Sequence, residues 1–127
     1  DYPAIMHKAA QAVAADPENN RGIIMGGSGQ GEAIVANKVA GIRCSLFYTP
    51  ALPKQAINIE GTQAADPFVM LGLTREHNGS NMLSLGVRFL SEEEMFHAVT
   101  VWLAAPDPTN ERHLRRIEQI KELEKHV

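Results

Sequence analysis

The sequence predicts an α/β fold, a three-layer αβα sandwich with a parallel Rossmann-like sheet. Three short apolar runs, over about 22–26, 42–47 and 81–85, have the length and composition of buried strands. Segments with helical periodicity lie between them, and strands that alternate with helices form a parallel sheet covered on both faces. With 127 residues the chain suits one domain with a real core, so we expect residues 1–127 to form a single domain.

The first half of the chain is expected to run helix, strand, helix, strand. A helix over about 4–15 ends at the breaker-rich turn 16–20, and the strand over about 22–26 follows. A glycine-rich stretch then leads into a helix over about 30–39, which Gly41 ends before the next strand.

The second half begins with a long loop, residues 49–67, which holds three prolines and a glycine. A loop of that length in a compact domain is usually functional, inserted or mobile. Ser91 and Glu94 form a capping box that starts a helix, and Pro106 ends it. The elements expected after the loop are helix 68–77, strand 81–85, helix 91–104 and helix 109–125.

The most informative stretch is Gly-Gly-Ser-Gly-Gln-Gly-Glu, from Gly26 to Glu32. Its glycines let the backbone approach a ligand closely, and free N–H groups at the start of a helix favour an anion. The stretch fails as a nucleotide loop. Glu32 and Ala33 stand where a triphosphate loop needs lysine and a hydroxyl, and Glu32 also replaces the third glycine of the dinucleotide fingerprint. Taken alone, Glu32 need only complement the helix dipole.

Other polar residues suit a sugar phosphate. Arg112 and Arg116 share one helix face and can grip a phosphate, although a solvated surface helix explains the same charge pattern. Arg88 follows a strand end directly. His77 and Asn78 pair a titratable ring with an amide. Because ligands of parallel sheets bind at the carboxyl ends of the strands, we expect the glycine loop and the cluster 75–78 to lie there together.

Composition excludes several classes of function. The net charge of −3 gives no sign of a nucleic-acid partner, and no apolar run reaches the length of a membrane span. The single cysteine, Cys44, fits a reducing cytoplasm and is expected to be a small buried core residue, not a nucleophile. Glu94 and His97 have the spacing of half a di-metal motif but are expected to be structural, and the five histidines show no zinc spacing.

Six segments in order resemble the type B ribose-5-phosphate isomerases, a family that also contains galactose-6-phosphate isomerase subunits. The resemblance covers nearly the whole chain and runs through residues 1–3, 26–32, 36–43, 75–78, 85–88 and 112–116. It implies an aldose–ketose isomerase of phosphorylated sugars that works through an enediolate, without metal or organic cofactor. The implied substrate is ribose 5-phosphate, converted to ribulose 5-phosphate.

The resemblance also implies a role for each site residue. Many members use a cysteine just before the glycine loop as the base, where this chain has Gly26. A cysteine-less branch has a glutamate just past the loop, which Glu32 matches, so Glu32 is implied as the base and His77 as the group that opens the sugar ring. By the same resemblance Ser28 contacts a substrate hydroxyl or positions the loop. The implied substrate-binding residues are Tyr2, Gly27, Gly29, Gly31 and Asn78, and the implied phosphate-binding residues are Arg88, Arg112 and Arg116.

Members of the family form dimers or tetramers with sites shared between subunits, so the resemblance implies a homodimer or tetramer. Two departures leave alternatives open. The family's first strand and its Asp-His-Ala-Gly motif are absent before residue 1, so we expect an N-terminal segment to be missing. The segment 49–74 is longer than usual. These departures motivate two alternatives, a six-carbon sugar-phosphate isomerase and a phosphosugar-binding module without turnover.

Overall fold

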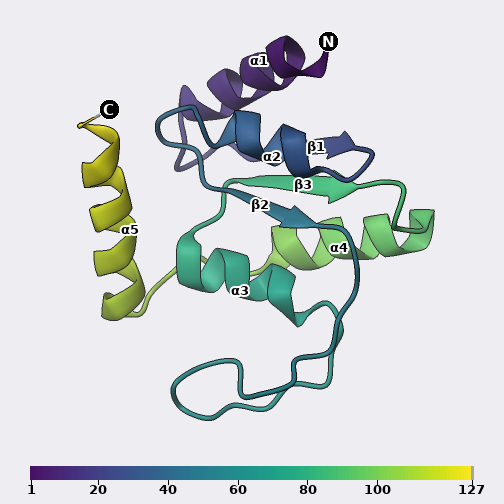
Figure 1. Cartoon of the computed structure of the whole chain (residues 1–127). Helices are drawn as coiled ribbons and strands as arrows, with labels where there is room; N and C mark the ends of the chain where they lie inside the picture. The colour runs from purple at the N-terminus through teal and green to yellow at the C-terminus, as the bar shows by residue number, and fades with distance from the viewer. Residues whose placement is uncertain (127) are drawn as a thin grey trace.

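The computed structural model describes residues 1–126. Over that range helices and strands alternate as the sequence predicts, and each expected element is present within a few residues of its expected ends (Figure 1). The elements, in order, are α1 (Tyr2–Ala14), β1 (Gly22–Gly26), α2 (Gln30–Ala36), β2 (Cys44–Phe47), α3 (Val69–Asn78), β3 (Met82–Gly86), α4 (Glu92–Ala104) and α5 (Glu111–Glu124).

The three strands form a parallel sheet in the order β1-β3-β2. Gly22 lies beside Met82 and Gly26 beside Gly86, so β1 and β3 end at the same level. Helices α1 and α2 cover one face of the sheet, and α3 and α4 cover the other (Figure 1). All five residues of β3 are buried, as expected for a central strand covered on both sides. The predicted αβα sandwich is therefore confirmed.

The core consists of two apolar clusters, one on each face of the sheet. Successive side chains of a strand point to opposite faces, so Met82 joins one cluster while Leu83 and Leu85 join the other. The second of these is built around Trp102 of α4, whose side chain is fully buried. Phe96, on the same helix, is 68% exposed and lies outside both clusters.

Local signals explain where α4 begins. The Ser91 hydroxyl accepts a hydrogen bond from the Glu94 N–H at 3.1 Å, and the Glu94 carboxylate accepts one from the Ser91 N–H at 2.8 Å, which forms the predicted capping box. His97 packs edge-on against Phe68, with ring centres 4.5 Å apart. Glu94 therefore caps the helix and His97 packs against Phe68, so both residues have the structural roles that the sequence predicts.

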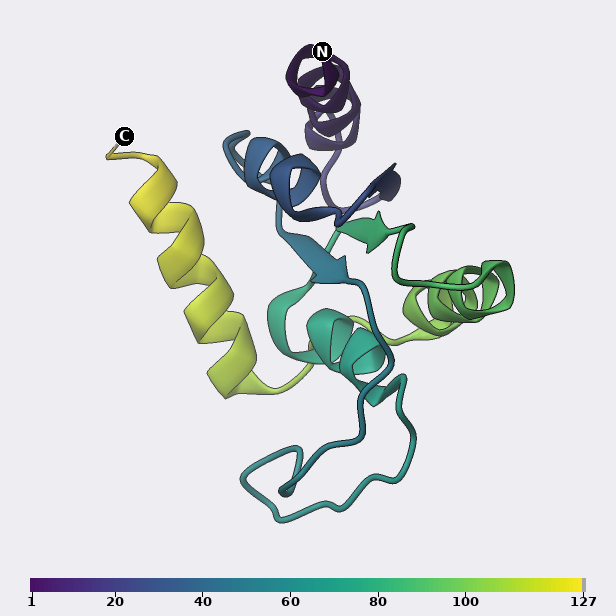
Figure 2. The ribbon, with the colours of Figure 1, turned by 45° about the vertical axis from the view of Figure 1, so that its right-hand side comes forward.

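Helix α5 stands at the side of the sandwich and packs against α3 (Figure 2). Ile117 is buried, whereas Ile120 and Leu123 on the same helix are 41% and 68% exposed. The far end of α5 is tied to the body by Glu124, whose carboxylate accepts a hydrogen bond from the Gly41 N–H at 3.1 Å. Among residues 1–126 no helix has both the length and the apolar character needed to cross a membrane.

Candidate active site

The glycine loop lies at the carboxyl end of β1 and is pinned to the end of β3. The positive φ of Gly29, 74°, turns the chain into α2, and the Ser84 hydroxyl donates to the Gly29 carbonyl at 2.7 Å. The N–H groups of Val87 and Arg88 donate to the carbonyls of Gly26 and Gly27 at 2.9 and 3.0 Å. The loop is therefore held rigidly where a parallel sheet binds its ligands.

Three backbone N–H groups of this loop, those of Ser28, Gly29 and Gly31, donate to no acceptor within residues 1–126. The Ser28 hydroxyl accepts a hydrogen bond from the Gln30 N–H at 3.2 Å, which supports the turn. Free N–H groups gathered at a helix start form a site for an anion or a developing negative charge.

Glu32 lies in the first turn of α2 and is only 7% exposed. Its carboxylate lies directly against the backbone of Gly26, where a Cβ at position 26 would overlap both carboxylate oxygens. No hydrogen bond or ion pair reaches this carboxylate from the described part of the chain. A buried carboxylate without a partner has the free lone pairs that a general base needs.

Tyr2 and Arg88 complete this side of the site. The Tyr2 hydroxyl lies against Gly31, where a Cβ would overlap it. The Arg88 guanidinium lies over Gly27, with Nε and Cζ 3.2 and 3.3 Å from the position of a Cβ there. Both side chains are exposed. The structure thus brings together the expected residues from α1, the loop, α2 and the end of β3, and we call Tyr2, Ser28, Glu32 and Arg88, with the loop glycines, the glycine-loop group.

The cluster 75–78 lies elsewhere, and the expectation that it joins the glycine loop is wrong. It forms the end of α3, and α3 leads directly into β3, so the cluster lies at the amino end of that strand. A helix that connects parallel strands returns the chain to the amino edge of the sheet. The five residues of β3 separate the two edges by about 15 Å.

At that amino edge His77 stacks on His113 of α5, with ring centres 4.2 Å apart and planes 18° from parallel. Both rings line a cavity of about 330 Å³ together with Arg112. Burial lowers the pKa of His113 below its ordinary value, and His77, Arg112 and Arg116 lower it further. We call His77, Asn78, Arg112, His113 and Arg116 the histidine group.

His113 is the residue that sequence reasoning missed as a site residue. It lies between two of the expected phosphate-binding arginines, within the segment 112–116. Its stacking on His77 depends on how α5 packs against α3, which no local pattern in the sequence reveals. The Nε atom of Arg112 is buried without a hydrogen-bond partner in residues 1–126, so this guanidinium keeps a free donor.

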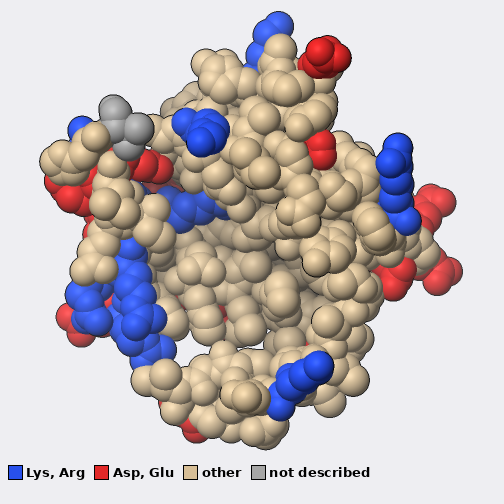
Figure 3. Space-filling view, viewed as in Figure 1, with Lys and Arg blue, Asp and Glu red and all other residues tan. Residues whose placement is uncertain are grey.

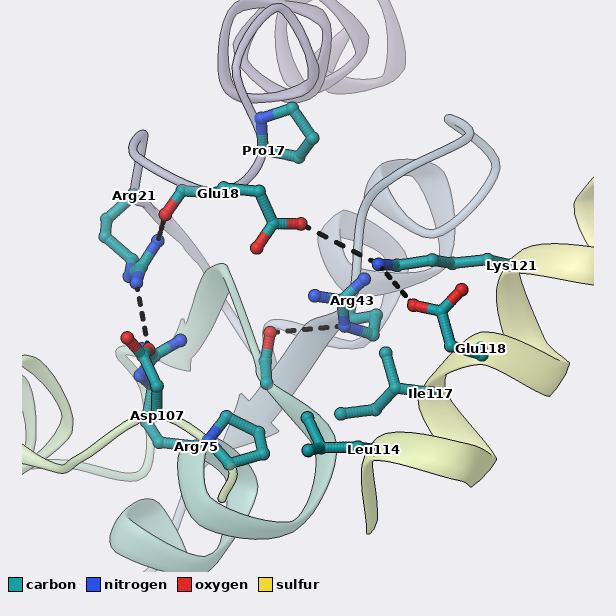
Figure 4. Close-up of a pocket in the computed structure, with 12 residues that line it drawn as sticks. Pro17, Glu18, Arg21, Arg43, Arg75, Asp107, Leu114, Ile117, Glu118 and Lys121 are labelled. Atoms are coloured by element: carbon teal, nitrogen blue, oxygen red, sulfur yellow. Dashed lines mark hydrogen bonds and ion pairs between the residues drawn. The ribbon is translucent and has the colours of Figure 1, made fainter. Parts of the chain in front are cut away.

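A network of ion pairs beside this cavity fixes α5 and the chain leading into it (Figure 4). Buried Arg75 donates to the Ser80 carbonyl and to the Asp107 carboxylate, and it lies over the Trp102 ring at 5.9 Å. From α5, Lys121 pairs with Glu18 at 3.8 Å. Arg75 therefore acts as a structural residue that holds the α4–α5 connection.

Two further features bear on the chemistry. Lys and Arg side chains gather along α5, beside a hollow in the face of the molecule (Figure 3).

Cys44 is only partly buried, although we expected a buried residue, and burial raises the pKa of its thiol to about 12. A thiol with that pKa is a poor nucleophile at neutral pH. Residues 1–126 contain no group of three His, Cys, Asp or Glu side chains placed to hold a metal ion.

Comparison with known proteins gives a consistent result. The family model described as Ribose/Galactose Isomerase matches residues 1–64 and 58–120. The chain is 37% identical over 125 residues to ribose-5-phosphate isomerase B of Mycolicibacterium paratuberculosis and 36% identical to that of Mycobacterium tuberculosis, covering 98% of this chain in both cases. It spans 67% and 65% of the length of these two relatives.

Solved structures agree. Type B ribose 5-phosphate isomerase from Trypanosoma cruzi superposes with a TM-score of 0.80 at 30% identity, over 100% of this chain and 72% of that one. Ribose-5-phosphate isomerase B from Mycoplasma genitalium with bound ribulose-5-phosphate gives a TM-score of 0.81 at 28% identity, over 100% of this chain and 71% of that one.

Proposed function

Because the chain belongs to the ribose/galactose isomerase family, we propose that it interconverts ribose 5-phosphate and ribulose 5-phosphate. The observation that carries the proposal is the buried, unpartnered carboxylate of Glu32 beside a glycine loop with free N–H groups. Moving the carbonyl of a sugar between C1 and C2 requires one base and one site for a negatively charged oxygen. The glycine-loop group offers both.

Glu32 is the proposed base. It removes the proton α to the carbonyl of the open-chain sugar, and the electron pair moves onto the carbonyl oxygen to give an enediolate. A proton passes from O2 to O1, the C2 carbonyl forms, and the same carboxylic acid returns its proton to C1. The lack of a hydrogen-bond or ion-pair partner within residues 1–126 favours this role, since it leaves the oxygens of this buried carboxylate free to accept the proton.

The N–H groups of the glycine loop are proposed to hold the enediolate oxygen, with Ser28 and Tyr2 contacting substrate hydroxyls. Gly27 and Gly31 matter here because they leave room beside the loop backbone for the side chains of Arg88 and Tyr2, and Gly29 supplies the positive φ that turns the loop into α2. Arg88, which lies over Gly27, supplies a cation near the developing charge.

The ring-opening and phosphate-binding steps are proposed to use the histidine group of a second chain. Within one chain Glu32 and His77 lie at opposite edges of the sheet, about 15 Å apart along β3, too far to act on one pentose at the same time. A homodimer or tetramer with shared sites removes this separation. His77 then opens the ring and Asn78 binds a substrate oxygen, while Arg112 and Arg116 hold the phosphate.

The direct test is ribulose 5-phosphate formation by the protein beside a Glu32→Gln variant. Glutamine keeps the shape of the side chain and removes the base, so we expect turnover to fall by about a hundredfold to ten-thousandfold. Equal turnover by both proteins would leave the reaction standing and remove Glu32 from it. Absence of turnover by both would count against ribose 5-phosphate as the substrate.

One observation keeps a six-carbon sugar phosphate as a second candidate, because the long 49–67 loop reaches the cavity of the histidine group. Relative turnover of five-carbon and six-carbon phosphates decides between them. A phosphosugar-binding module without turnover is the third reading. Incorporation of solvent deuterium at the α-carbon of a bound sugar phosphate excludes it, because that exchange needs a working base.

A further inference from the structure

The loop 49–67 carries its tip to the histidine group. The Ala51 N–H donates to the Pro67 carbonyl at 3.0 Å and closes the base of the loop. Near the tip, the Ile57 N–H donates to the Thr62 carbonyl at 2.9 Å. These bonds give a long segment without helix or strand a defined shape, seen at the bottom of Figure 1.

Two residues of the tip, Asn58 and Glu60, line the same cavity as His77 and His113. The Asn58 carboxamide oxygen accepts a hydrogen bond from the Thr62 N–H at 3.0 Å, so Asn58 holds the turn that presents Glu60. The loop therefore adds a carboxylate to a cavity whose other walls come from α3, α5 and the connection before α5.

The charges around the stacked rings make that carboxylate significant. His77, on which His113 stacks, lowers the pKa of His113, and Arg112 and Arg116 act in the same direction. Glu60 is the neighbour whose charge acts in the opposite direction on the pKa of His113.

Two other carboxylates line the cavity. Glu76 belongs to α3, and Asp107, from the connection, is paired with Arg75 and Arg21. Glu60 forms no ion pair with a lysine, arginine or histidine of the described chain, so its charge remains available to the two rings.

We propose that Glu60 is a positioning residue for the histidine group: its carboxylate lines the same cavity as the two stacked imidazoles and stabilises the proton that this pair of rings gives to the sugar. This inference rests on the proposed function. In that step the C1–O bond of the sugar ring breaks, the ring oxygen takes the proton held by the stacked pair His77 and His113, and the C1 hydroxyl releases its proton to water as the carbonyl forms. Glu60 acts through the ring and touches no reacting atom.

The first test follows the histidine C2 protons by NMR across pH in the wild type, Glu60→Gln, Glu60→Asp and Glu93→Gln. His113 is assigned by its loss in His113→Asn. We expect the Glu60→Gln midpoint of His113 to fall by about half a pH unit, since removal of one nearby carboxylate from a solvated cavity has an effect of roughly that size. Glu60→Asp keeps the charge, so its His113 midpoint should lie close to that of the wild type.

Glu93 is the matched control, because it is an exposed carboxylate in the first turn of α4, at the other edge of the sheet. An unchanged His113 midpoint in Glu60→Gln, or an equal shift in Glu93→Gln, overturns the proposal. If the shift in Glu60→Gln came from a change in the fold of the loop, Glu60→Asp would not restore the wild-type midpoint. Comparison of these two variants therefore separates the effect of charge from the effect of shape.

The second test is the pH profile of kcat/KM for ribose 5-phosphate. The protonated pair of rings is the active form, so activity declines as pH rises, and in Glu60→Gln this decline is expected at lower pH, in the same direction as the shift of the His113 midpoint. An NMR shift with an unmoved profile overturns the role in ring opening. If the His113 midpoint shifts in Glu60→Gln but the wild-type protein shows no isomerisation, the proposed function is overturned instead. The two failures are therefore distinguishable.

Discussion

The carboxylate of Glu32 occupies the space that a side chain on Gly26 would need. A Cβ built on Gly26 overlaps both oxygens of that carboxylate, so the two positions are sterically coupled. A side chain at position 26 is therefore incompatible with the observed position of the Glu32 carboxylate. The glycine that ends β1 therefore decides where the proposed base lies.

From this coupling we predict that Gly26→Ala lowers kcat/KM by about a hundredfold, because a displacement of a catalytic group by about 1 Å has that effect. The loss is expected in kcat/KM for ribose 5-phosphate measured by ribulose 5-phosphate formation. Circular dichroism checks that the variant is folded.

Gly72→Ala is the control for this substitution. Gly72 lies inside α3 with nothing within 4 Å of a Cβ, so alanine there should raise the free energy of unfolding by about 0.5–1 kcal/mol and leave activity unchanged. Full activity in Gly26→Ala would show that the carboxylate of Glu32 is not needed at this place.

A second prediction follows from the separation of Glu32 and His77. Two variants, Glu32→Gln and His77→Asn, are each expected to be nearly inactive. When they are mixed and allowed to exchange subunits, a shared site in the mixed dimer contains both native residues. Activity should then recover to about a quarter of the wild-type value, because half of the dimers are mixed and each has one intact site.

The same mixture made from Glu32→Gln and Arg88→Gln provides the control. Both of these residues belong to the glycine-loop group of one chain, so no site in their mixed dimer is intact and no recovery is expected. Recovery in neither mixture would place the whole site within one chain.

The sequence was sufficient to predict the layered fold, since periodicity and end signals are local. The capping box of Ser91 and Glu94 lies where the pattern placed it. The glycine-loop group was also predictable, because its loop and base are close in the sequence and its edge follows from parallel topology.

The edge at which His77 lies follows from the same parallel topology, so the expectation that it joins the glycine loop misapplied that rule. Its distance from Glu32 depends on which edge the end of α3 reaches, and a helix before a parallel strand ends at the amino edge. The stacking of His77 on His113 depends on long-range packing of α5 against α3.

The raised pKa of Cys44 leads to a third prediction. With a pKa of about 12, almost none of the thiol is ionised near pH 8. Alkylation of native protein by iodoacetamide should therefore be at least about a hundredfold slower than that of the urea-unfolded chain, because the thiolate is the reacting form. Isomerase activity should survive the treatment. Alkylation at equal rates in the two states would contradict the raised pKa.

The lowered pKa of His113 predicts how stability depends on pH. Between this lowered value and the ordinary value of 6.5, the unfolded chain binds more protons at this residue than the folded chain does. The free energy of unfolding therefore rises with pH across this window, and the contribution is lost as the solution is acidified through it. Urea unfolding at about pH 7.5 and at about pH 5 measures the difference.

His113→Asn should show a smaller loss of stability over this interval than the wild type, because it removes the titrating ring. Other groups also titrate there, so the comparison uses His7→Asn as well, a substitution of an exposed histidine on α1. His7→Asn should follow the wild type. If His113→Asn loses as much stability on acidification as the wild type, then the ring carries no proton linkage, and the burial of His113 against His77 would not disfavour its protonation.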